Sequence, residues 1–127
     1  REIANLLALA DRDLRACQTP DLDPDWRLSL AHNAALQLAT AALAASGYRA
    51  ARDGYHARVL DSLALTIGAD ARLIRRLDSF RRKRNQAAYE LSGLASATEA
   101  DEMVALAAEL WGLVTAWLSE NHPDLGL

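Results

Sequence analysis

Alanine and leucine recur at intervals of three and four residues through most of this 127-residue chain. Residues at this spacing share one face of an α-helix, and both residue types are strong helix formers. Hydrophobic residues make up 51% of the sequence, prolines number three, and β-branched residues are few, so a sheet is disfavoured. The chain is therefore predicted to be all-α.

Glycines, prolines and short polar segments divide this pattern into helices. Asp23 followed by Pro24 is typical of a helix start, and Gly47 is typical of a helix end. Five helices are predicted at about residues 2–17, 24–46, 55–67, 71–91 and 98–120. Because the connections are short, consecutive helices should run antiparallel in an up-and-down bundle. The expected organisation is one domain at 1–120 followed by a frayed C-terminal tail at 121–127.

Several classes of site and location are disfavoured by the composition. Cys17 is the single cysteine, so an internal disulfide is impossible and a cytoplasmic location is expected. His32, His56 and His122 lack companions at metal-ligand spacing, and no glycine-rich nucleotide loop occurs, so no metal and no cofactor are predicted. The sequence contains no uninterrupted apolar run long enough to cross a membrane, so no membrane span is predicted. Cys17 is expected to fill the core, and His32 to be partly exposed.

Three tryptophans lie on the predicted helices, Trp26, Trp111 and Trp117. Their first interpretation is as anchors of the core or of an interface. The alternative is that one of them stacks on a nucleobase, which requires an exposed ring.

The net charge of −3 conceals a strong asymmetry. Seven of the 14 basic residues lie between positions 72 and 84, where Asp78 is the only acid, so this stretch carries +6 and the remainder −9. Such a helix face attracts phosphates through counterion release, or is simply a solvated surface. The exposed basic residues are predicted to be Arg72, Arg75, Arg76, Arg82 and Lys83.

Arg84 breaks the amphipathic pattern of this helix. At about 100° per residue it lies about 20° from Leu77, in the middle of the apolar stripe, and Arg81 lies about 40° away on the other side. An unpaired buried guanidinium is costly. Arg84 is therefore predicted to pair with an acid such as Asp78 or Asp61, to face a dimer interface, or to line a ligand cleft. The remaining alternative is that its methylenes cover apolar surface while the charge reaches water.

The segment from Asp78 to Tyr89, DSFRRKRNQAAY, adds Asn85 beside Arg84 and forms a predicted polar seam of Asp78, Asn85 and Tyr89. It resembles the motif helix of the HEPN superfamily, small helical bundles frequent in prokaryotic toxin–antitoxin and defence systems. The resemblance implies a homodimer that acts on RNA, with Arg84 stabilising the charge of the scissile phosphate and Asn85 as its polar neighbour. A histidine follows four to six positions after the arginine in catalytic members, and here that position is Tyr89.

The sequence thus predicts a HEPN-like module that binds RNA or a nucleotide and has weak or absent ribonuclease activity. Arg84, Asn85 and Tyr89 are the predicted catalytic positions, with His56 as a second candidate for proton transfer. The predicted binding residues are Arg81, Arg82, Lys83, Asp78 and His56. Expected partners are a second copy of the chain and an antitoxin-like protein. The alternative is a non-catalytic protein-interaction or dimerisation module in which Arg84, Asn85 and Tyr89 are structural.

Overall fold

The structure of this chain, a computed structural model, describes residues 1–89 and 95–126, together with their side chains except those of residues 86–89. All regular elements in these residues are helical, which confirms the all-α prediction. The five α-helices are α1 (Glu2–Ala16), α2 (Pro24–Ala45), α3 (Tyr55–Asp61), α4 (Ala71–Tyr89) and α5 (Ala97–Asn121). Two 3-10 helices, η1 (Ser62–Ala64) and η2 (Pro123–Leu125), follow α3 and α5.

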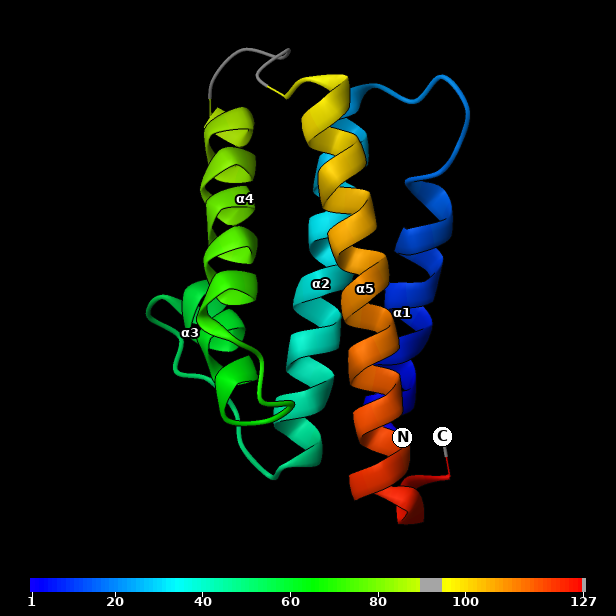
Figure 1. The fold of residues 1–127 in the computed structure, drawn as a ribbon, viewed down its shortest axis with the longest axis vertical. Coiled ribbons are helices and arrows are strands. Elements are labelled where there is room, and N and C mark those ends of the chain that lie inside the picture. The colour runs from blue at the N-terminus through cyan, green and yellow to red at the C-terminus, as the bar shows by residue number, and fades with distance from the viewer. Residues whose placement is uncertain (90–94, 127) are drawn as a thin grey trace.

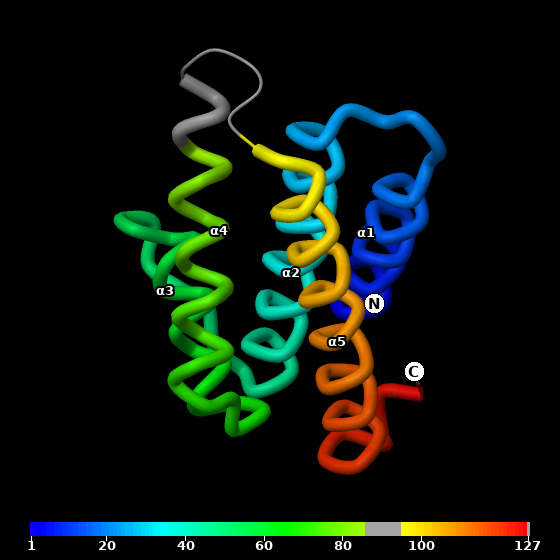
Figure 2. The backbone as a smooth tube through the Cα atoms, turned by 45° about the horizontal axis from the view of Figure 1, so that its top comes forward, coloured from blue at the N-terminus to red at the C-terminus, as the bar shows by residue number. Residues whose placement is uncertain are grey.

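The four long helices alternate in direction along the chain, as Figure 1 shows. Helix α2 is central and packs against each of the other four α-helices. The tube in Figure 2 shows α1 and α5 on one side of α2 and α3 and α4 on the other. The protein is therefore an up-and-down bundle with the short α3 added beside α4.

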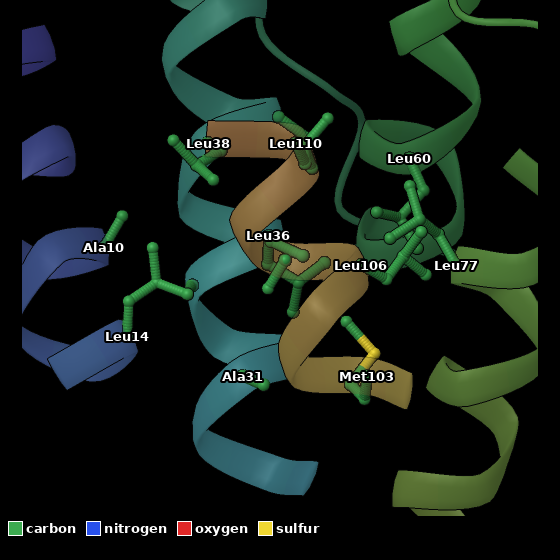
Figure 3. Close-up of a cluster of buried hydrophobic side chains, with 14 of the residues drawn as sticks. Ala10, Leu14, Ala31, Leu36, Leu38, Leu60, Leu77, Met103, Leu106 and Leu110 are labelled. Atoms are coloured by element: carbon green, nitrogen blue, oxygen red, sulfur yellow. The ribbon is translucent and has the colours of Figure 1, made fainter. Parts of the chain in front are cut away.

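Apolar side chains from all five helices form the core around α2 (Figure 3). Leu38 of α2, Leu60 of α3, Leu77 of α4 and Leu110 of α5 are fully buried. Each such leucine contributes about 1.5–3 kcal/mol through removal of its side chain from water. Cys17 is also fully buried, as predicted for a core-filling residue.

The predicted ends of α2 are confirmed. The Asp23 carboxylate accepts a hydrogen bond from the backbone N–H of Asp25 (2.9 Å), and Pro24 occupies the first turn. After the last turn, Gly47 adopts a positive φ of 86°, which glycine tolerates without steric cost. These local signals place both ends of the central helix.

The third helix is shorter than predicted. It ends at Asp61 rather than near Ile67 and continues as the 3-10 turn η1. The Ser62 hydroxyl donates to the Val59 carbonyl oxygen (2.6 Å), and the Thr66 hydroxyl donates to the Ser62 carbonyl oxygen (3.3 Å). In η1 the backbone hydrogen bonds are three residues apart instead of four, as in the bond from the Leu65 N–H to the Ser62 carbonyl oxygen (2.9 Å).

The C-terminal segment is more regular than a frayed tail. Asn121 still belongs to α5, and residues 123–125 form η2. The ring of His122 packs edge-on against Trp117 of α5, with ring centroids 4.9 Å apart. Contact with α5 therefore orders the segment up to Leu125.

Among the described helices, α2 and α5 are long and apolar enough to cross a membrane by length and composition alone. Half of the apolar window of α2 is buried within the bundle, and core helices of water-soluble proteins meet the same criterion. The expectation that no segment spans a membrane therefore stays a prediction.

Candidate functional site

Arg84 projects from α4 toward α2, so the prediction that it turns inward is confirmed. The residue is partly buried, and its Nε donates a hydrogen bond to the Ser29 hydroxyl (3.2 Å). None of the ion pairs between described residues includes Arg84. Burial lowers the pKa of Arg84 below its ordinary value, which reflects the cost of removing its charge from water. Among the described residues, the guanidinium thus meets a neutral hydroxyl instead of a carboxylate.

His32 lies one turn after Ser29 on α2 and is fully buried. The prediction that it is partly exposed is wrong, because α2 is the central helix and α4 covers this face. Neither ring nitrogen makes a hydrogen bond of good geometry to a described residue. Burial and the positive charges of Arg84 and His56 lower the pKa of His32 to about 3, and only the nearby Leu77 carbonyl acts in the opposite direction. His32 is therefore neutral near pH 7.

His56 reaches the same place from the first turn of α3. Its ring is largely exposed, and partial burial together with the positive charges of Arg84 and Arg81 lowers its pKa. Three helices therefore bring five residues together, which we term the Arg84 cluster. Its members are Ser29 and His32 of α2, His56 of α3, and Arg81 and Arg84 of α4.

Asp78 belongs to Arg81 and Arg82 rather than to Arg84. Its carboxylate accepts a hydrogen bond from Arg81 Nε (2.7 Å) and forms an ion pair with Arg82 (3.0 Å). The bond from Arg81 is the main reason that the pKa of Asp78 is lowered. The predicted pairing of Arg84 with Asp78 or Asp61 is therefore wrong, since Asp78 is already engaged along its own helix and Asp61 is exposed.

The other two positions of the predicted motif differ in how they are placed. Asn85 is exposed, so it points away from the direction taken by Arg84. Tyr89 is the last residue of α4, and its side chain lies outside the described part of the structure.

The outer face of α4 carries more acid than the sequence suggested. A groove of about 850 Å³ runs along it, and four basic residues on its walls are exposed. Lys83, however, pairs with Glu99 of α5 (3.3 Å), and Glu102 of α5 lines the same groove. The prediction of five exposed basic residues is therefore wrong for Lys83, because the bundle brings the acidic start of α5 beside α4. The four exposed basic residues are Arg72, Arg75, Arg76 and Arg82.

Two members of the Arg84 cluster were missed by the sequence analysis. Ser29 and His32 are polar residues three positions apart on a helix whose buried face is otherwise apolar, and Asp25 lies one turn earlier. This spacing places all three residues on one face of α2. These three polar residues on one face of α2 could have indicated a site from the sequence alone. Their position relative to Arg84 depends on how α4 packs against α2.

Among the described residues, no group of three or more histidine, cysteine or carboxylate side chains could hold a metal ion. The Arg84 cluster instead combines two guanidiniums with two imidazoles and a hydroxyl. Groups of this kind bind anions, and phosphate oxygens fit the donor geometry of arginine especially well.

No protein-family model, curated protein or solved structure matches this chain. The resemblance to the HEPN superfamily therefore depends on residues 78–89 and on the order of the helices, and it stays a prediction. Any function has to be argued from the geometry of the Arg84 cluster.

Proposed function

We propose that this protein is a HEPN-like module that binds RNA or a nucleotide by holding a phosphate at the Arg84 cluster. The observation that carries the proposal is the partly buried guanidinium of Arg84, which donates to the Ser29 hydroxyl and lies beside the fully buried imidazole of His32. A bound anion would offset the cost of burying this charge.

The donor inventory of Arg84 favours a phosphate. A guanidinium carries five N–H groups, and Arg84 donates one of them to a described residue. Phosphate oxygens accept paired hydrogen bonds from arginine, and such charge-assisted bonds are roughly twice as strong as neutral ones. The Asp78 carboxylate forms ion pairs with both Arg81 and Arg82. Arg84 is therefore the residue that would supply most of the attraction to a phosphate.

A bound phosphate would change the electrostatic surroundings of the two imidazoles. Positive neighbours lower the pKa values of His32 and His56 in the structure without a ligand. A phosphate placed between them and Arg84 would act in the opposite direction and favour the protonated imidazole. His56, which is the more exposed of the two, would then donate a further hydrogen bond to the ligand.

We propose binding with little or no ribonuclease activity. Tyr89 stands where catalytic members of the superfamily have histidine, and a phenol with an ordinary pKa of about 10 is poorly suited to proton transfer near pH 7. If cleavage occurs, Arg84 would stabilise the charge on the reacting phosphate. Either Tyr89 or His56 would move the proton.

Phosphate binding at this site predicts a strong dependence on salt. Three phosphate contacts to a single strand should weaken the affinity about 20-fold between about 50 and 200 mM salt. Fluorescence anisotropy of a labelled RNA oligonucleotide, titrated at several salt concentrations, measures this slope. A purified protein that binds no RNA even at low ionic strength would rule out the proposal.

The proposed context is a cytoplasmic toxin–antitoxin or defence system with an antitoxin-like protein partner. We further propose a homodimer, as the resemblance to the HEPN superfamily implies. Sedimentation velocity at micromolar concentration should give the mass of a dimer. A monomer under those conditions contradicts this part of the proposal.

A second candidate function rests on the same hydrogen bond. The bond from Arg84 to Ser29 joins α4 to α2, so Arg84 could serve to fix how these helices cross. The protein would then be a non-catalytic interaction or dimerisation module. The two candidates differ in what the loss of Arg84 should do, as the Discussion describes.

A further inference from the structure

Trp26 is the largest exposed aromatic side chain near the Arg84 cluster. It lies in the first turn of α2 and is 64% exposed, so the prediction of a core anchor is wrong for this residue. Trp111 and Trp117, in contrast, are partly buried and pack against the core. An indole ring this exposed is free to stack on the ring of a partner.

The position of Trp26 on α2 places it on the same flank as Ser29. Ser29 lies one turn later, displaced by about 60° around the helix, and it holds Arg84. Arg27 lies about 100° away in the other direction, where its Nε donates to the Cys17 carbonyl at the end of α1 (3.3 Å). Trp26 therefore occupies the open sector of α2 between α1 and α4, nearer to α4.

The axial separation is also short. Three residues of an α-helix span about 4.5 Å along the axis, so Trp26 and Ser29 are neighbours on the surface of α2. Arg84 Nε is 3.2 Å from the Ser29 hydroxyl oxygen. An indole face and a guanidinium at such positions can contact the base and the phosphate of adjacent nucleotides at once.

We infer that Trp26 is a stacking platform for a nucleobase of single-stranded RNA whose phosphate lies at the Arg84 cluster. This inference rests on the proposed function and narrows its ligand. Base stacking on an aromatic ring needs an unpaired base, whereas the bases of a duplex are already stacked within the helix. A base on Trp26 and a phosphate at Arg84 would belong to adjacent nucleotides, so a mononucleotide could not make both contacts.

The test compares Trp26→Ala with Trp26→Phe, which keeps an aromatic face. Tyr48→Ala is the matched control, because Tyr48 is 69% exposed and follows the opposite end of α2. The probes are a labelled single-stranded RNA, an abasic oligonucleotide with the same number of phosphates, the corresponding RNA duplex, and a mononucleotide. Thermal melting by circular dichroism verifies that each variant folds, which the exposure of both side chains favours.

Trp26→Ala should weaken the affinity for single-stranded RNA about 5- to 150-fold and change the affinity for the abasic oligonucleotide less than about twofold. Trp26→Phe should retain most of the affinity, and Tyr48→Ala should retain all of it. The duplex and the mononucleotide should both bind more weakly than the single strand.

Equal affinity of the parent protein and Trp26→Ala for the single strand would overturn the role of Trp26 and leave the proposed function standing. Equal weakening for the RNA and the abasic probe would overturn stacking. A duplex or a mononucleotide that binds as tightly as the single strand would overturn the ligand class. If the parent protein binds none of the four probes, the proposed function fails, and this inference fails with it.

Discussion

Lowering the pH from about 7 to about 4.5 is expected to reduce the free energy of unfolding by about 2–3 kcal/mol through His32 alone, given its folded-state pKa of about 3. Burial is the main reason for this low pKa. Arg84 and Arg81 of α4 and His56 of α3 add positive charge around the ring. Protonation would therefore place a further charge in a buried site that already repels it.

The direction follows from the two states of the imidazole. In the unfolded chain His32 has an ordinary pKa near 6.5, so below that pH the unfolded chain binds more protons than the folded protein. The contribution to stability is complete above about pH 6.5 and is lost progressively as the pH falls toward about 3. His56, whose pKa is also lowered, contributes in the same direction.

Urea denaturation at a series of pH values measures this effect. His32→Leu should reduce the loss of stability between about pH 6.5 and 4.5, while His122→Gln at the C-terminal end of the protein should leave it unchanged. An unaltered pH dependence in His32→Leu would mean that the buried imidazole does not control acid stability.

Replacing Arg84 with alanine is expected to weaken RNA binding about 10- to 150-fold, the range for loss of a charge-assisted hydrogen bond. The effect on folding should be small. Removal of the hydrogen bond to Ser29 destabilises the protein, but removal of a partly buried cation beside His32 and His56 relieves repulsion. Binding by anisotropy and melting by circular dichroism, measured on the same preparation, report both quantities.

Arg75→Ala is the matched control for this variant. It removes the same charge from the exposed face of the same helix. The control should weaken RNA binding only slightly and should reduce its salt dependence by no more than one contact. Arg84→Ala with unchanged RNA affinity contradicts the proposed function. A fall of 10 °C or more in the melting temperature, about 2–3 kcal/mol for a domain of this size, would instead favour the structural candidate.

The helices themselves could be predicted because their causes are local. Asp23, Pro24 and Gly47 place the ends of α2, and the Asp70 carboxylate accepts a hydrogen bond from the Leu73 backbone N–H (2.8 Å) at the start of α4. Helical periodicity alone also turned Arg84 toward the core. The error at α3 arose because periodicity does not distinguish an α-helical turn from the 3-10 turn η1, which also buries Leu63 in the core.

The candidate site was only partly predictable. Its arginine stands out in the sequence, but its surroundings come from residues far away in the chain. Ser29 meets Arg84 across 55 positions, and Lys83 pairs with Glu99 on the following long helix. The expected acid partner for Arg84 was wrong because Asp78 is closer to Arg81 and Arg82 on the same helix face.

The amino-acid sequence by itself determined the all-α class, the helix ends that depend on capping residues, and the inward direction of Arg84. Each of these follows from hydrogen bonds and side-chain spacing within a few residues. Only the tertiary structure decided that His32 is buried, that His56 approaches Arg84, and that Trp26 stays exposed. These features depend on which helix lies at the centre of the bundle, and that is set by packing among all the helices rather than within any one of them.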